Sequence, residues 1–73
     1  MIKELDSVVL MTDLPEHGLS EGDLGTVVLV HEEAGYEVEF VTLEGETLAV
    51  VSLGTNQVRQ ISPREIAHAR LVG

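Results

Sequence analysis

The chain has 73 residues, enough for one domain, and its thirteen Asp and Glu outweigh four Lys and Arg, giving a formal net charge of −9. This balance argues against binding to nucleic acids or anionic membranes, because affinity for phosphates depends on counterion release by Lys and Arg. A basic protein partner would instead be attracted by the negative field. The chain has no cysteine, which excludes a disulfide framework and a cysteine-ligated metal.

No stretch approaches the roughly 20 apolar residues of a membrane span. The first six residues, Met-Ile-Lys-Glu-Leu-Asp, lack the basic-then-apolar order of a signal peptide. We therefore expect a soluble, cytoplasmic protein. A domain of this size buries only about 60% of the surface that its unfolded chain exposes, so association with another chain would add to its stability.

The first half of the sequence predicts two strands separated by a loop. Residues 7–12 form a β-branched apolar run of strand length. Residues 14–19 cannot extend it, because Pro15 lacks a ladder donor, and we expect Leu14 and Leu19 to fold back over one end of a barrel. The second strand is expected at residues 26–31. Its unbroken apolar run would place Val27 and Leu29 on one face, with the intervening valines on the other.

A glycine-punctuated turn, Glu-Gly-Asp-Leu-Gly, leads into this second strand. Its signature residues are Gly22, Asp23, Gly25 and Thr26. Gly-Asp is a strong turn signal, since glycine adopts positive φ without steric cost and aspartate bonds nearby backbone amides. We expect positive φ or close backbone approach at one or both of Gly22 and Gly25.

Three more strands are predicted in the second half, at residues 36–42, 47–53 and 57–61. In the first of them Tyr36, Val38 and Phe40 alternate with glutamates, and we expect these three side chains to face the core. After these strands, residues 62–65 match a capping box with proline at its first helical position. Residues 66–72 fit either a short helix or a strand. We favour one helical turn followed by a strand that returns beside residues 7–12, because closure removes exposed edges.

The predicted fold class is therefore all-β: one domain over residues 1–73, forming a small SH3-like barrel of five to six antiparallel strands with a short helical turn near Pro63. Residues 22–28, Gly-Asp-Leu-Gly-Thr-Val-Val, resemble the turn and strand shared by KOW-type and other SH3-like barrels. That resemblance implies binding to RNA or to proteins. Acidic residues stand here where the RNA-binding members carry basic or aromatic ones.

A second resemblance extends over most of the chain. The motifs at 22–28, 35–41, 45–51 and 65–70 are similar to those of a small bacterial family, domain of unknown function 4926. The resemblance implies the fold without an established activity, and it implies an antitoxin- or immunity-like role that would mask a basic, toxin-like protein.

Catalytic, cofactor and metal sites are not expected. The sequence lacks a cysteine nucleophile and a phosphate-binding loop of the G-x-x-x-x-G-K type. Its paired strand glutamates would share a solvated face, whereas acid–base catalysis needs a desolvated carboxyl. The three histidines, His17, His31 and His68, lie in separate segments without a metal-ligand spacing. We therefore expect a non-enzymatic protein.

Two surfaces are candidates for binding. Acidic side chains would contact a basic partner through Asp13, Glu16, Glu21, Asp23, Glu32, Glu33, Glu37 and Glu39. Apolar side chains left over from a small core would form an interface through Val28, Val30 and Val41. Three of the four cations, Arg59, Arg64 and Arg70, fall in the last fifteen residues, and we expect one or two of them to pair with Glu37, Glu39 or Asp13.

These features leave three interpretations: an acidic protein-binding module, a homo-oligomeric structural module, or a KOW-type RNA binder. Electrostatics favours the first interpretation over the third.

Overall fold

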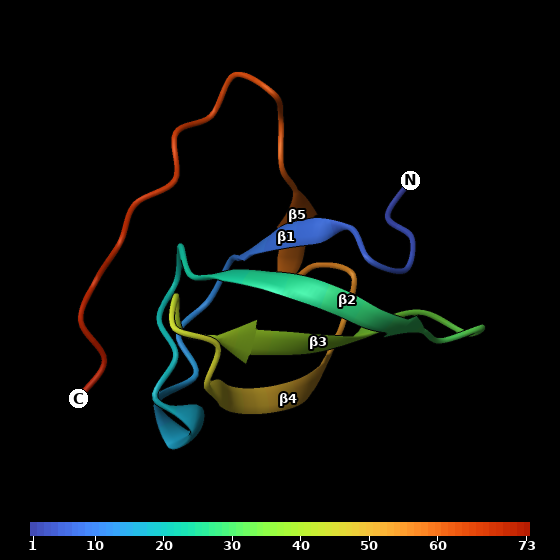
Figure 1. Cartoon of the computed structure of the whole chain (residues 1–73). Helices are drawn as coiled ribbons and strands as arrows, with labels where there is room; N and C mark the ends of the chain where they lie inside the picture. Colours follow the sequence, from blue (N-terminus) through green and yellow to red (C-terminus); the bar gives the residue numbers. More distant parts are fainter.

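The computed structural model describes residues 1–73 and is all-β, with five antiparallel strands in one sheet (Figure 1). The strands are β1 (Ser7–Leu10), β2 (Leu24–Val30), β3 (Tyr36–Val41), β4 (Thr47–Leu53) and β5 (Val58–Gln60). Their order in the sheet is β4-β3-β2-β1-β5, so the last strand pairs with the first. The five predicted strands and the all-β, SH3-like fold class are confirmed.

The sheet bends around one apolar core to which all five strands contribute. Nine buried side chains form it: Val8, Leu10, Leu19, Val27, Val38, Phe40, Val51, Leu53 and Val58. The two edge strands, β4 and β5, lie at opposite ends of the strand order yet both supply core residues. The sheet therefore wraps around its core in place of lying flat.

Strand β3 shows the predicted alternation. Val38 and Phe40 are buried and Tyr36 packs against the core, while Glu37 and Glu39 lie on the outer face. Pairing on both sides, with β2 and with β4, makes β3 a central strand of the sheet. The alternation of apolar and acidic residues in the sequence causes this arrangement, because successive side chains of a strand point to opposite faces.

The glycine turn behaves as expected at both glycines. Gly22 has φ +98°, a conformation that other residues rarely adopt. At Gly25 the constraint is space: a Cβ atom there would lie 2.5 Å from Val38 Cγ1 and 2.8 Å from Phe40 Cε2. Strand β2 can cross the core side chains of β3 this closely only because position 25 has no side chain.

Strand β2 departs from the prediction because it carries a β-bulge. Val27 pairs with Val38, but the next pair is Leu29 with Glu37, which leaves Val28 as the extra residue. Leu29 consequently shares the outer face with Glu37, and Val30, paired with Tyr36, returns to the inner face. The expectation that Val27 and Leu29 share one face is therefore wrong.

The C-terminal segment is a second correction. Residues 61–73 form neither a strand nor a helix; they run as an extended tail that leaves β5 and passes along one side of the barrel (Figure 1). The predicted closing strand beside β1 is absent because β5 occupies that edge. Near Pro63 the chain makes a single hydrogen-bonded turn, from Glu65 N–H to Ser62 C=O (3.2 Å).

The only helix, the 3₁₀ helix η1 (Pro15–His17), lies in the β1–β2 loop and ends at Gly18, which has φ +70°. No helix of this structure has the length and apolar character needed to cross a membrane. The fold thus places a long loop, a short turn and the tail at one end of the barrel, and the β2–β3 turn at the other (Figure 1).

Candidate functional site

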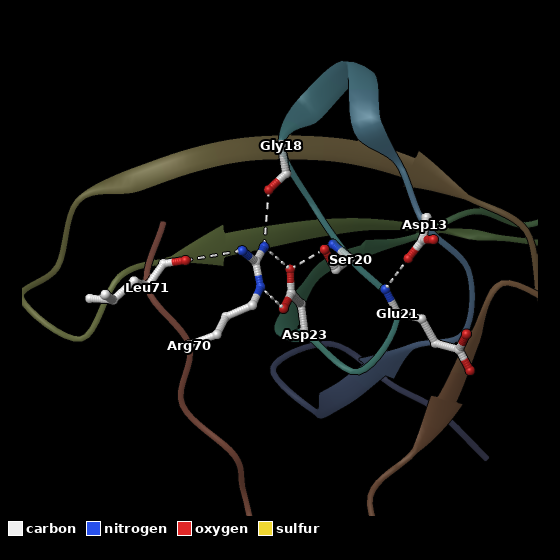
Figure 2. Close-up of polar contacts among 7 residues, drawn as sticks. All are labelled: Asp13, Gly18, Ser20, Glu21, Asp23, Arg70 and Leu71. Atoms are coloured by element: carbon white, nitrogen blue, oxygen red, sulfur yellow. Dashed lines mark hydrogen bonds and ion pairs between the residues drawn. The ribbon is translucent and has the colours of Figure 1, made fainter. Parts of the chain in front are cut away.

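The β1–β2 loop is fastened at several points independently of the tail. Leu14 and Leu19 exchange backbone hydrogen bonds of 2.9 and 3.1 Å, and Leu19 is buried in the core as predicted. The Asp13 carboxylate accepts the Glu21 backbone N–H at 2.9 Å (Figure 2). These contacts fix the path of the loop between η1 and the glycine turn.

Asp23 is the centre of the site. Its Oδ2 accepts the Ser20 N–H at 2.9 Å, which holds the carboxylate within the loop. The Arg70 guanidinium donates to the same carboxylate through two nitrogens, Nε to Oδ1 at 2.7 Å and Nη2 to Oδ2 at 2.6 Å. Nη2 also donates to the Gly18 carbonyl at 3.0 Å (Figure 2). A planar donor is thus held by three acceptor oxygens on one loop.

This ion pair is better shielded than the others that Lys and Arg make in the structure. The Asp23 side chain is 16% exposed and the Arg70 side chain 39%. Hydrogen bonding by Arg70 lowers the pKa of Asp23 despite partial desolvation, and Asp23 in turn raises the pKa of Arg70. Both groups therefore remain charged across the physiological pH range.

A groove of about 620 Å³ lies between the tail and the barrel end, next to the Arg70–Asp23 pair. Its barrel wall consists mainly of apolar side chains: Leu19, Leu24, Phe40, Val41, Leu43 and Leu48. Tail residues 67–72 form the opposite wall. Arg70 makes the tail's hydrogen bonds to the barrel end, whereas Leu71 is 96% exposed and Val72 is 41% exposed. The groove is thus a partly covered apolar surface.

The eight predicted acidic contacts lie in three separate places. Asp13, Glu16, Glu21 and Asp23 are on the β1–β2 loop, Glu32 and Glu33 are in the β2–β3 turn, and Glu37 and Glu39 are on the outer face of β3. The structure therefore does not gather them into one surface, and the loop holds the largest group.

Several of these carboxylates are already engaged within the chain. Glu37 accepts hydrogen bonds from Ser52 and His31, and the Ser52 contact is the larger cause of its lowered pKa. Glu39 accepts from Thr47 at 2.8 Å. By contrast, Glu16, Glu21, Glu32 and Glu33 are exposed, and none of them pairs with a cation.

The predicted partners of the arginines are wrong. Arg70 pairs with Asp23, and Arg59 of β5 forms a bidentate pair of 2.7 Å bonds with Glu65 of the tail. Arg64 has no carboxylate partner. The tail arginines do not pair with Glu37 or Glu39, because the tail does not run beside the outer face of β3.

The Arg59–Glu65 contact explains the turn near Pro63. Glu65 also accepts the Ser62 N–H at 2.8 Å, so one half of the predicted capping box forms. Hydrogen bonding by Arg59, followed by that of Ser62, lowers the pKa of Glu65 to about 2. The helix does not continue, because a segment this short needs a packed face and Ile66 is 90% exposed.

The three valines predicted as an interface are all exposed but do not form one patch. Val41 borders the groove, whereas Val28 and Val30 lie toward the other end of β2. Tyr36, the partner of Val30, is five residues from Val41 on β3, roughly 17 Å along a strand.

The histidines are likewise dispersed. His17 is in η1, His31 pairs with Glu37 at the end of β2, and His68 borders the groove. No group of three or more His, Asp or Glu side chains is placed to hold a metal ion.

Sequence reasoning missed three contributors to the site, Gly18, Glu44 and Glu46, and gave the wrong partner for a fourth, Arg70. The Gly18 carbonyl is invisible to side-chain patterns, and Arg70 meets Asp23 across 47 residues of sequence. Glu44 and Glu46, in the β3–β4 turn, add carboxylates near the groove, which Glu44 lines. Their signal was present as a Glu-Gly-Glu turn, but only the fold places that turn at the end of the barrel that holds the β1–β2 loop.

Comparison with known proteins gives one family. No curated protein and no solved structure matches this chain. The family model described as Domain of unknown function (DUF4926) matches residues 4–60, which include all five strands, the glycine turn and Asp23 but not the tail. The chain therefore belongs to the DUF4926 family.

Proposed function

We propose that this protein is a non-enzymatic acidic module that binds and masks a basic protein, in the manner of an antitoxin or immunity protein. The observation that carries the proposal is the barrel end, where an apolar groove is lined by Glu44 and the adjoining β1–β2 loop exposes Glu16 and Glu21, all three without a cation partner. Apolar contact area supplies affinity in protein interfaces, and complementary charge supplies orientation and association rate.

Charge pairing within the chain strengthens this argument. Lys3, Arg59 and Arg70 each pair with one carboxylate, so ten of the thirteen Asp and Glu have no Lys or Arg partner. Self-repulsion among these groups destabilises the folded chain, and a basic partner would relieve it. The same field opposes phosphate binding, so we propose no nucleic-acid ligand, and we place the interaction in the cytoplasm.

The β1–β2 loop is the best-supported contact surface among the acidic groups. Glu16 and Glu21 project from a loop whose backbone is held by its own hydrogen bonds, so little further ordering is needed on binding. Glu44, in the β3–β4 turn, adds a carboxylate that lines the groove, and Glu46 lies two residues further along the same turn. The outer face of β3 is less suited, because its two glutamates already accept hydrogen bonds.

Matched double variants test the proposal. Glu16→Gln with Glu21→Gln removes two exposed carboxylates at the groove end, and Glu32→Gln with Glu33→Gln removes two at the opposite end. A protein captured by the wild-type chain from cells of the source organism is identified, purified and used in binding kinetics with each variant. We expect its pI to exceed about 9, and its association rate to fall with rising salt and with the groove-end variant only.

Two results would contradict the proposal. One is that no basic protein is retained by the wild-type chain at moderate salt. The other is that both double variants weaken binding equally, since a general charge effect does not depend on which end of the barrel loses its carboxylates.

A homo-oligomeric module is the second candidate, favoured by one observation. The outer face exposes Val28, Leu29 and Val50, and β4 is an unpaired edge strand. Under this alternative, light scattering over a concentration series would show a dimer that Val50→Thr disrupts. A monomer at every concentration would exclude it.

A further inference from the structure

The acceptor oxygens around Asp23 form a compact group at one end of the barrel. Two carboxylate oxygens and the Gly18 carbonyl converge on one planar cation, and that cation is the chain's own Arg70. We propose that this is an arginine-recognition site, that Arg70 of the tail fills it in the free protein, and that an arginine of the basic partner displaces Arg70 on binding. The choice of a basic protein as partner rests on the proposed function.

The chemistry of the site selects a guanidinium. Nε and Nη2 donate side by side to the two oxygens of Asp23, and Nη2 reaches the Gly18 carbonyl as well. Such a parallel pair of N–H bonds needs a rigid, planar fork, which arginine has and lysine lacks. An ammonium group would satisfy the charge of Asp23 without the two-point contact.

The acceptors are arranged without help from the tail. Ser20 N–H holds the Asp23 carboxylate, and the Asp23 backbone bonds Ser20 C=O (3.0 Å) and Leu10 N–H (2.8 Å). Gly18 is fixed as the residue that ends η1. A site without Arg70 would therefore keep its shape and present the partly desolvated carboxylate of Asp23. An unpaired charge in such surroundings costs free energy, so the site favours occupation by another cation.

The tail is held weakly enough to be exchanged. Beyond the turn at residues 62–65 it makes no backbone hydrogen bond to the barrel, and its apolar residues Ile66 and Leu71 are almost fully exposed. Nine residues, 61–69, connect β5 to Arg70, so the tethered arginine competes at an effective concentration on the order of millimolar. A partner arginine can outcompete the tethered Arg70 when the partner also gains binding energy from contacts in the groove.

The family match separates the two halves of the contact. Asp23, Ser20 and Gly18 lie inside the matched residues 4–60, and Arg70 lies ten residues beyond them. The acceptor thus belongs to the part of the chain that the family model describes, and the arginine filling it belongs to the tail. The apolar groove next to the site is walled by the same tail, so displacement of Arg70 would uncover both surfaces together.

The test uses the full chain and a peptide of its own residues 66–73, Ile-Ala-His-Ala-Arg-Leu-Val-Gly, added to ¹⁵N-labelled protein and followed by NMR. We expect the Arg70→Ala chain to bind this peptide at least about tenfold more tightly than the wild-type chain, whose own tail competes. Shifts should centre on Gly18, Ser20 and Asp23. Adding Asp23→Asn to the Arg70→Ala chain should abolish binding.

A peptide with citrulline in place of arginine controls for folding defects in the variants, because it removes the positive charge from the ligand and leaves the protein unchanged. Its failure to bind supports the site. Equal binding of the two peptides, or equal affinity of the wild-type and Arg70→Ala chains, overturns it. The site and the proposed function can be refuted separately. Peptide binding without capture of any basic protein would refute only the function. Capture of a basic protein that is unaffected by Asp23→Asn would refute only the site.

Discussion

The barrel body, residues 1–60, and the tail, residues 61–73, are held by different forces. The body has a nine-residue apolar core and continuous backbone pairing from β4 to β5. The tail is joined to the body by two arginine–carboxylate pairs, one between Glu65 and Arg59 of β5 and one between Arg70 and Asp23 of the loop. Burial of apolar surface supplies most folding stability, whereas exposed ion pairs add about 0–1 kcal/mol each. The body therefore determines whether the chain folds, and the tail determines which surface is covered.

The largest predicted effect lies in the body. Phe40 is 2% exposed at the centre of the core, so Phe40→Ala should lower the free energy of unfolding by about 3–5 kcal/mol. The matched truncation in the tail, Ile66→Ala, should change it by less than about 0.5 kcal/mol. Urea denaturation measures both. Comparable losses would mean that the tail contributes to the core.

A smaller loss is expected from adding one methyl group in the glycine turn. The Cβ atom of Gly25→Ala would clash with Val38 and Phe40, which should cost about 1–3 kcal/mol. Gly54→Ala is the control, because a Cβ there meets only the ends of two flexible side chains. Thermal unfolding of the two variants should differ clearly. A Gly25→Ala chain as stable as the wild type would show that β2 and β3 are not this close.

Loss of the tail contact should leave stability nearly unchanged. Arg70→Ala should alter the free energy of unfolding by less than about 1 kcal/mol. It should nevertheless reduce the ¹⁵N heteronuclear NOE of residues 66–72 to values typical of a mobile segment, with no change in the strands. Arg64→Ala, which removes a cation without a carboxylate partner, should change neither quantity. An unchanged NOE in the Arg70 variant would show that another contact holds the tail.

The pH dependence should be confined to acid. The pKa of Asp23 is below its ordinary value of 3.8 in the folded chain, so the stability that its pairing adds is complete above that value. It is lost as pH falls through the lowered pKa. The tail should therefore stay attached from pH 8 to about pH 5 and detach in more acid solution. NMR signals of residues 66–72 followed against pH test this. Detachment near neutral pH would contradict the assignment of the tail contact to Asp23.

The body was largely predictable from the sequence because local patterns determine it. Alternation in β3 identified its core face, and the bounds of β4 were predicted without error. The bulge in β2 was missed because Val27-Val28-Leu29-Val30 is apolar throughout, and such a run carries no period of two from which a register can be read.

The candidate site was only partly predictable. Asp23 was identified through its turn, but the residue that completes the site comes from the far end of the chain. Residues 66–72 fit either a short helix or the closing strand that we favour, and neither forms because the apolar side chains of this segment stay exposed. An ion pair across 47 residues leaves no local pattern, so the pairing of Arg70 with Asp23 required the fold.

The central claim, that Arg70 fills a site meant for an arginine of the partner, is tested most directly by observing Arg70 itself. Its Nε–H, bonded to Asp23, should give an NMR signal separate from those of free arginine side chains. Adding the basic partner, or the arginine peptide in excess, should move this signal to the free position as the occupant takes over Asp23. A partner that binds while the Arg70 signal stays in place would contradict the claim.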